Sequence, residues 1–255
     1  MSFSADWLAL RTPFDAAARD VGLERHLAAW AAARTAETGQ PLAVIDLGAG
    51  SGNNYRHLAP RLGVMQHWTL LDSDRGLLRL APDRVDTQLC NLAAGPEAAI
   101  PDGVDLVTAS ALIDLVSEPW LAALLARAEA VGAALFVVLS YDGRIAWETE
   151  HAADARVVEL VNRHQRGDKG FGPALGPTAG DALRRLSDRP VLEARSDWLI
   201  GSGDTAMRAA LVEGWRSAAA EIAPDESSAL NAWAEAARLR AETVVVGHVD
   251  QLILQ

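Results

Sequence analysis

The feature that most constrains this chain is a glycine-rich loop between an apolar run and a helix-forming segment. Gly48, Gly50 and Gly52 follow directly on the run Leu42–Leu47. Glycine lets the backbone turn sharply and lets a ligand approach where a Cβ atom would otherwise stand. The N-terminus of the following helix offers N–H groups and a favourable dipole to an anion. A strand, a loop and a helix in this order predict a cofactor site at the carboxyl edge of a parallel sheet.

Apolar runs and amphipathic segments alternate along the chain. Runs that are apolar on both faces are typical of parallel strands covered by helices on two sides. Regular alternation predicts an α/β fold with right-handed crossovers and a doubly wound sheet. The seven predicted strands span 42–47, 67–72, 87–90, 104–109, 134–140, 191–200 and 243–254. The predicted helices span 16–36, 53–62, 75–80, 154–166, 205–222 and 226–241, with one that opens at Glu118 and one that ends near Ser187.

The whole chain, residues 1–255, is expected to form a single domain. We divide it into an N-terminal helical cap at 1–40, a cofactor-binding core at 41–140 and a substrate-side half at 141–255. The alternation changes after residue 141, where a helical insertion separates the last two predicted strands. Ordinary doubly wound domains lack such an insertion, so the substrate-side half is where a lid over a substrate is expected.

Charge and composition disfavour several classes of protein. The chain has 34 acidic against 23 basic residues, a formal net charge of −11 that repels phosphate backbones. Nucleic acid is therefore disfavoured as a partner, and the cluster Arg184, Arg185 and Arg189 is interpreted as a solvated face. No apolar run is long enough to span a bilayer, and residues 1–6 lack the pattern of a signal peptide. The single cysteine, Cys90, suits the reducing cytoplasm.

The spacing of the glycines separates two kinds of cofactor. A dinucleotide-binding loop would place its third glycine at position 53, where this chain has Asn53. The third glycine is instead Gly52. A second acid, Asp72, ends the next predicted strand, and a carboxylate in that place can accept both hydroxyl hydrogens of a ribose. The spacing therefore favours a cofactor with a ribose other than a dinucleotide.

Four segments resemble motifs of the class I S-adenosylmethionine-dependent methyltransferases. In chain order they are residues 45–54 (IDLGAGSGNN), 70–74 (LLDSD), 105–112 (DLVTASAL) and 245–250 (VVGHVD). The resemblance implies a Rossmann-like seven-stranded sheet with a reversed last strand, and S-adenosylmethionine as the cofactor. No constellation of metal ligands stands out, so no metal is expected.

The resemblance also implies which residues bind the cofactor. They are Asp46, Gly48, Ala49 and Gly50 for the methionine part, Asp72 for the ribose, Ser73, Asp74, Asn91 and Leu92 for the adenine, Ser110 beneath the sulfonium, and Arg11 for the carboxylate. Asn54 is also expected to bind the cofactor. Many members have an acid where this chain has Asn91, which is a departure from the pattern. Around Arg11, the residues Trp7, Leu10 and Phe14 could equally form only a hydrophobic latch.

Three residues are candidates for catalysis. Asp114 follows the fourth predicted strand and could bind a cationic amine, act as a base, or cap a helix. His164 and Asp168 lie in or beside the glycine-rich loop at 167–177, where either could bind or deprotonate a substrate. The alternative is that His164 caps a helix C-terminus while Asp168 is solvated.

Aromatic residues suggest further lining for a substrate site. Trp198, Trp215 and Trp233 fall in the helical insertion, where they could form a pocket for a flat or cationic substrate or simply pack in the core. Tyr141 could line the site together with Trp147. His248 and Asp250 share one face of the last predicted strand, and a buried structural pair is the favoured interpretation.

The resemblance implies transfer of a methyl group to a small-molecule acceptor by in-line displacement. A sulfonium is a strong methyl donor, so alignment and exclusion of water can supply much of the catalysis. Two alternatives stay open: an aminopropyl-type transferase that uses a decarboxylated cofactor, and a non-catalytic S-adenosylmethionine-binding or scaffold protein. Nucleic-acid amino-methyltransferases usually carry Asp/Asn-Pro-Pro-aromatic where residues 110–113 read SALI, which disfavours that subclass.

Overall fold

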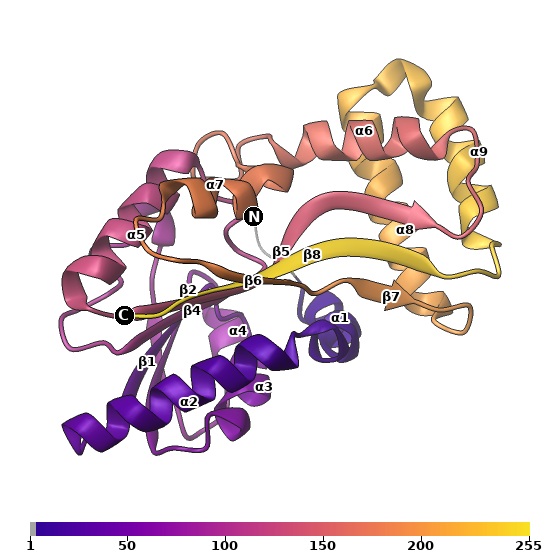
Figure 1. Ribbon diagram of the computed structural model, residues 1–255. Helices are drawn as coiled ribbons and strands as arrows, with labels where there is room; N and C mark the ends of the chain where they lie inside the picture. The colour runs from indigo at the N-terminus through magenta and orange to yellow at the C-terminus, as the bar shows by residue number, and fades with distance from the viewer. Residues whose placement is uncertain (1–3) are drawn as a thin grey trace.

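A mixed sheet forms the centre of the chain (Figure 1). The structure is a computed structural model that describes residues 4–255; residues 1–3, part of the segment without a signal-peptide pattern, lie outside the described residues. Eight described strands run in the order β3-β2-β1-β4-β5-β8-β6, and β7 also pairs with β8. They are β1 (Leu42–Leu47), β2 (Gln66–Asp72), β3 (Asp86–Leu89), β4 (Leu106–Ser110), β5 (Ala134–Trp147), β6 (Leu192–Arg195), β7 (Trp198–Ile200) and β8 (Val244–Ile253).

The strand directions confirm the expected Rossmann-like sheet with a reversed last strand. Strands β1 to β5 pair in parallel, whereas β8 runs antiparallel to β5, β6 and β7. Parallel neighbours carry their carboxyl ends at one edge of the sheet, so the loops that follow β1, β2 and β4 meet there. The glycine loop, which follows β1, therefore lies beside the ends of β2 and β4, the two neighbours of β1 in the sheet.

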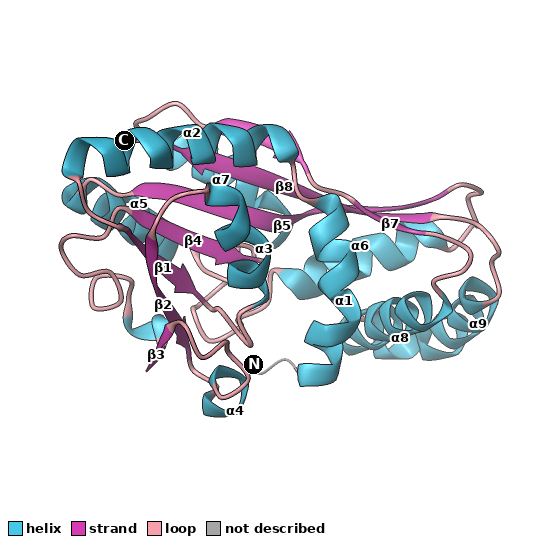
Figure 2. Ribbon diagram, turned by 90° about the horizontal axis from the view of Figure 1, so that it is seen from below, coloured by secondary structure: helices cyan, strands magenta, loops and turns pink. Residues whose placement is uncertain are grey.

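Helices cover both faces of the sheet (Figures 1 and 2). On one face, α2 and α3 pack leucines against β1 and β2, and on the other face α5 and α7 pack against β4 and β5. A third group, α6, α8 and α9, packs on the extended part of β5 and β8. The α-helices are α1 (Ala5–Ala18), α2 (Val21–Thr38), α3 (Asn53–Leu62), α4 (Arg75–Leu78), α5 (Glu118–Val131), α6 (Asp154–Gln165), α7 (Ala179–Leu186), α8 (Thr205–Ile222) and α9 (Ser227–Arg238). Within residues 4–255, no helix combines the length and apolar character that crossing a membrane requires.

Two predicted elements differ from the structure. The helix expected at 16–36 is two helices, because the chain turns at residues 19–20 and the Asp20 side chain caps α2 by accepting the N–H of Leu23. α1 continues through Pro13, which a sequence pattern reads as a helix breaker. The strand expected at 191–200 is β6 and β7, separated where Ser196 and Asp197 contact β8: the Ser196 N–H donates to the His248 carbonyl, and Asp197 accepts the His248 N–H.

A β-bulge in the middle of the sheet bends β5 towards its extended part. Val138 and Leu139 stand opposite the single residue Asp250, because the register shifts between Val137 and Ser140. Leu139 has φ +56°, a conformation that costs a residue with a side chain about 1–2 kcal/mol. The Asp250 carboxylate stabilises it by accepting the Leu139 N–H at 2.8 Å.

The same carboxylate holds the N-terminal helices. Its second oxygen accepts the N–H of Asp20 at 3.1 Å and lies 3.8 Å from the buried guanidinium of Arg19. Arg19 also lies 3.5 Å from Glu24 on α2. A fully buried carboxylate thus joins the centre of the sheet to the turn between α1 and α2.

We expect Asp250→Ala to lower the free energy of unfolding by about 3–5 kcal/mol, because it leaves buried donors and part of a buried charge without a partner. Urea unfolding followed by circular dichroism measures the change. Asp102→Ala removes an exposed carboxylate that pairs with Arg127 and serves as the control; it should change the free energy by no more than about 0.5 kcal/mol. Equal losses in both variants would contradict a central role for Asp250.

Candidate functional site

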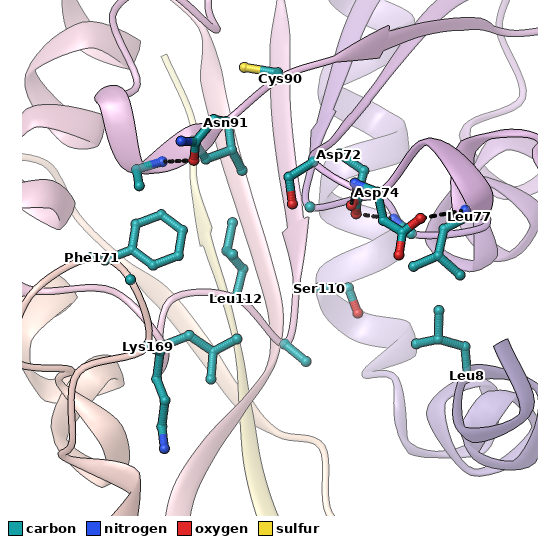
Figure 3. A pocket seen from close by; sticks show the side chains of 18 of the residues that line it. Leu8, Asp72, Asp74, Leu77, Cys90, Asn91, Ser110, Leu112, Lys169 and Phe171 are labelled. Carbon is teal, nitrogen blue, oxygen red and sulfur yellow. Dashed lines mark hydrogen bonds between the residues drawn. The ribbon is translucent and has the colours of Figure 1, made fainter. Parts of the chain in front are cut away.

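A cavity of about 330 Å³ lies at the carboxyl ends of β1, β2 and β4 (Figure 3). We call it the first cavity. It is bounded by the glycine loop, the acidic loop after β2, the ends of β3 and β4, and the loop before α7. Its lining residues are Leu8, Arg11, Gly48, Gly50, Asp72, Ser73, Asp74, Leu77, Cys90, Asn91, Leu92, Ala93, Ser110, Ala111, Leu112, Leu115, Lys169, Gly170 and Phe171.

The glycine loop forms one wall of the first cavity because two of its glycines adopt conformations that other residues avoid. Gly48 and Gly50 have φ of +64° and +55°. A Cβ atom at Gly48 would lie 3.3 Å from the Leu112 side chain, and one at Gly50 would lie 3.1 Å from Leu8. The backbone is therefore exposed to the cavity where a side chain would fill it.

Asp72 is held in a fixed orientation at the end of β2. One carboxylate oxygen accepts the N–H of Gly50 at 2.8 Å, and the other accepts the N–H of Asp74 at 2.8 Å. Each oxygen keeps a further lone pair for a ligand. The predicted acid thus couples the glycine loop to the acidic loop and presents its carboxylate to the cavity.

Asn91 and Phe171 lie on the opposite side of the first cavity (Figure 3). The Asn91 side-chain oxygen accepts the N–H of Ala93 at 3.1 Å and caps a short 3₁₀ turn. This bond uses one lone pair of the amide oxygen, and the amide nitrogen is a donor that a ligand can use. Phe171 packs edge to face against Trp120, at 5.6 Å between ring centroids.

Three residues predicted to bind the cofactor do not line the first cavity. Asp46 is buried beneath the loop, where it accepts hydrogen bonds from Asn54 and Thr108, both at 2.7 Å. Burial raises the Asp46 pKa to about 6. Asn54 also accepts a hydrogen bond from Arg19 at 2.8 Å. Ala49 is turned into the core, and its N–H donates to Leu71. These residues support the loop from below.

A second cavity of about 390 Å³ adjoins the first. The two share Arg11, Ala111, Leu115 and Lys169. The other lining residues of the second cavity are Trp7, Asp114, Leu139, Tyr141, Val161, His164, Gln165, Trp198, Ala210, Leu211, Gly214, Trp215, Ala218, Val246 and His248. They come from α1, α6, α8 and the extended part of the sheet, which meet here as Figure 2 shows.

Arg11 reaches both cavities from α1. Its guanidinium pairs with Asp15 at 2.9 Å and lies 5.0 Å from the centre of the Trp198 ring. The Trp198 indole N–H donates to the same Asp15 carboxylate at 3.1 Å. Trp7, Leu10 and Phe14 pack against the core, as a hydrophobic latch would, and Arg11 lines the first cavity as well.

Asp114 lines the second cavity with a side chain that has little compensation for its burial. It is 8% exposed, and its Oδ1 atom is inaccessible to solvent and accepts no hydrogen bond from the described residues. Burial raises the Asp114 pKa to about 6. The Asp114 carbonyl accepts the N–H of Gly176 at 2.8 Å, which fixes its backbone.

The other two catalytic candidates fall in different places. His164 lines the second cavity, with its Nε2 atom 3.1 Å from Glu221. Asp168 is exposed and lines neither cavity, because its carboxylate accepts the N–H groups of Gly170 and Gly172 and organises the loop. The adjacent Lys169 lines both cavities instead, and burial lowers its pKa.

Some of the aromatic residues predicted for the substrate site line the second cavity, and others do not. Trp198 and Trp215 line the second cavity together with Tyr141. Trp233 lies in the core and donates to Asp154 at 2.8 Å. Trp147 is at the far end of β5 under Arg240, 4.4 Å from the guanidinium, so it does not join Tyr141 at the cavity.

His248 and Asp250 are both buried but do not pair with each other. Asp250 supports the bulge, whereas the His248 ring lies 4.6 Å from Trp198 and lines the second cavity. Burial lowers the His248 pKa to about 3, so the ring is neutral. Its Nδ1 atom lies 3.0 Å from the Val246 carbonyl, which can only accept. The proton is therefore on Nδ1, and Nε2 carries a lone pair.

Strained backbone marks the place where the cavities meet. Ala111, at the end of β4, has φ +51°, and its N–H donates to Val138. Together with Leu139 it is one of two residues other than glycine, in the described part, with positive φ. Both line the second cavity, which fits the tendency of backbone strain to gather at functional sites.

Several lining residues were missed by sequence reasoning. Leu8, Leu77 and Lys169 belong to segments that are distant in sequence from the glycine loop. The predicted residues Ser73, Asp74, Leu92 and Ser110 do line the first cavity. No group of three or more histidine, cysteine, aspartate or glutamate residues suited to a metal is found between residues 4 and 255.

The overall fold is shared with solved methyltransferase structures. A candidate type II methyltransferase from Anaeromyxobacter dehalogenans is 18% identical, over 91% of this chain and 95% of that chain, with a TM-score of 0.51. A cyclopropane-fatty-acyl-phospholipid synthase-like protein from Lactobacillus casei is 15% identical, over 98% and 100%, with a TM-score of 0.50. These likenesses confirm the Rossmann-like methyltransferase fold.

Other comparisons cover a smaller share of the matched protein or find no match. The chain spans 30% of the length of the bifunctional kinase-methyltransferase WbdD, with a TM-score of 0.38. No protein-family model matches the sequence. No curated protein matches it either.

We expect Asp114→Asn to stabilise the protein at pH 8. The folded-state pKa of Asp114 is about 6, above the unfolded value near 4, so the carboxylate costs stability at high pH and this cost disappears as the pH falls. The gain in the free energy of unfolding should be about 1–3 kcal/mol at pH 8 and near zero at pH 4. Urea unfolding at both values measures it, and a gain that does not depend on pH would contradict this origin.

Proposed function

We propose that this chain is an S-adenosylmethionine-dependent methyltransferase that binds the methyl donor in the first cavity and a small-molecule acceptor in the second. The observation that carries the proposal is the junction of the two cavities at Ala111 and Leu115. One cavity has the polar groups of a nucleoside site, and the adjoining one is mainly apolar and aromatic. A donor and an acceptor held there would meet with little water between them.

The residues of the first cavity fit the parts of this cofactor. Asp72 would accept both ribose hydroxyl hydrogens, since each carboxylate oxygen keeps a lone pair after binding the backbone. Asn91 would donate its amide N–H to a ring nitrogen of adenine, whereas an acid at this place would accept from the amino group. Arg11 and Lys169, at the junction, would attract the methionine carboxylate. When bound, the cofactor supplies an activated methyl group that a nucleophile can displace in line.

The chain's own residues would then align the reaction. The glycine-loop backbone and Ser110 would hold the donor, and the Ala111 turn would set its distance from the acceptor. The donor residues come mostly from 41–140 and the acceptor residues mostly from α1 and 141–255, which supports the proposed division of the chain. Of the three predicted catalytic residues, His164 and Asp114 line the second cavity and could accept a proton. Asp168 has no such place.

A small molecule fits the second cavity better than a nucleic acid does. The cavity is apolar, and the basic cluster considered earlier is largely neutralised: Arg184 pairs with Asp181 and Glu193, and Arg185 pairs with Glu118. With a formal net charge of −11, the chain offers little attraction to phosphates. With Cys90 as its one cysteine, we also propose the cytoplasm as its compartment.

We expect isothermal titration calorimetry to detect binding of S-adenosylmethionine and of its demethylated product. Asp72→Ala should weaken both by about 1–3 kcal/mol, because the ribose loses its acceptors and the loop loses two anchors. Asp86→Ala removes an exposed carboxylate on the neighbouring strand and should leave the affinity unchanged. Binding of NAD in place of S-adenosylmethionine and its demethylated product would overturn the proposal.

Transfer of labelled methyl groups to a small-metabolite panel distinguishes the proposed reaction from its alternatives. An aminopropyl transferase would bind and consume the decarboxylated cofactor instead. A scaffold protein would bind the cofactor without turnover on any acceptor. Either outcome would leave the cofactor site intact and refute methyl transfer.

A further inference from the structure

We propose that the acceptor is an amine attached to an aromatic or bulky apolar group, and that Asp114 binds its nitrogen and receives its proton. This inference rests on the proposed function for the reaction, but not for the binding of the amine. It follows from the chemistry of the groups that line the second cavity.

Three polar groups that line the second cavity can accept hydrogen bonds from a ligand. Asp114 is a buried carboxylate that lines the cavity, and carboxylate oxygens only accept hydrogen bonds. His248 is neutral with its proton on Nδ1, which leaves Nε2 as an acceptor. The Tyr141 hydroxyl donates its hydrogen to Asn162 at 2.8 Å, which leaves lone pairs on its oxygen. A ligand that satisfies these three groups must donate hydrogen bonds, as an amine or ammonium does.

The aromatic wall of the second cavity also favours a cation. Trp7, Trp198, Trp215 and Tyr141 line it, and the faces of such rings attract positive charge. Trp198 already has the Arg11 guanidinium near its ring, 5.0 Å from the centre. The remaining rings are available to an incoming group, and their area suits an aromatic or apolar body.

Two resident positive charges line the second cavity, and that of Arg11 acts on Asp114 by favouring its charged form. Arg11 is paired with Asp15 at 2.9 Å. Lys169 lies at the boundary with the first cavity, 3.5 Å from Nδ1 of His164, which in turn contacts Glu221. Arg11 and Lys169 are therefore placed to serve an anionic group of the donor at the junction.

Because of its position in the chain, Asp114 would hold the acceptor nitrogen near the methyl donor. Asp114 is adjacent to Leu115 and three residues from Ala111, and both of these line the first cavity as well. An amine at Asp114 therefore lies at the end of the second cavity that is nearest the donor. The Asp114 carboxylate would first take one proton from the bound ammonium, which frees the nitrogen lone pair. That lone pair would then form the new N–C bond as the C–S bond of the donor breaks and a neutral thioether leaves.

Binding can be tested without the cofactor by tryptophan fluorescence, because three tryptophans line the second cavity. The probes are 2-phenylethylamine, the uncharged 2-phenylethanol and the anionic 3-phenylpropionate, which share a phenyl group and differ at the polar end. We expect the amine to bind roughly tenfold or more tightly than either analogue. Equal affinities, or preference for the carboxylate, would overturn the inference.

Variants of the protein show which residue produces the preference for the amine. Asp114→Asn keeps the shape of the side chain and should remove the preference for the amine while leaving 2-phenylethanol binding unchanged. Trp215→Leu should weaken all three probes, and Asp102→Asn, on the exposed surface, should change none. An amine preference that survives Asp114→Asn would also overturn the assignment.

A final arm separates this inference from the proposed function. Wild-type protein is incubated with labelled S-adenosylmethionine and matched libraries of aryl-alkyl amines, alcohols and carboxylates. Labelled product from the amine library alone supports both. Product from alcohols or carboxylates alone would refute the amine and retain methyl transfer. Failure to bind the cofactor would refute the proposed function, while the fluorescence titrations would still decide the amine site.

Discussion

The arrangement of both cavities depends on one buried carboxylate, that of Asp250. It accepts the N–H of Leu139 at the bulge and the N–H of Asp20 between the first two helices. The bulge redirects the outer part of β5. Tyr141 and His248, which stands opposite it on β8, therefore lie in the second cavity. The turn at Asp20 directs α1 across the same place, so that Arg11 lies at the junction of the cavities. A carboxylate that lines neither cavity thus sets the relative position of sheet and helical cap.

The two cavities divide the chemistry between them. Backbone groups and fixed polar side chains, such as Asp72 and Asn91, line the first cavity and are already anchored by hydrogen bonds. The second cavity has large aromatic surfaces and few polar groups, and its Asp114 has no partner among the described residues for Oδ1. Preorganised groups lose little freedom when a ligand binds, whereas an uncompensated carboxylate gains most from a ligand that pairs with it.

Three residues near the junction of the two cavities have features that lower the stability of the folded state. Ala111 and Leu139 adopt positive φ, and Asp114 is a buried carboxylate with a raised pKa. Each lowers the stability of the folded state by an amount on the order of 1–3 kcal/mol. None is needed for the sheet to form, and all three residues line the second cavity. Costs of this kind persist where function needs them.

The sequence alone determined the sheet, its glycine loop and most of the first cavity. Strand periodicity, the spacing of Gly48, Gly50 and Gly52, and an acid at the end of β2 are local signals, and local backbone chemistry is enough to interpret them. Local signals do not determine how deeply a side chain is buried. Asp46 follows the family pattern in sequence, yet it is buried below the loop because its oxygens bind Asn54 and Thr108.

Only the tertiary structure decided which residues form the second cavity. Trp7, Trp198 and His248 are separated by much of the chain and meet because the bulge and the turn before α2 direct their elements to one place. The same packing places Trp147 and Trp233 away from the second cavity. The sequence alone did not distinguish these two tryptophans from those that line the cavity. The burial of Asp114, and the lack of a partner for its Oδ1 among residues 4–255, are properties of three-dimensional surroundings, which no spacing of residues along a chain encodes.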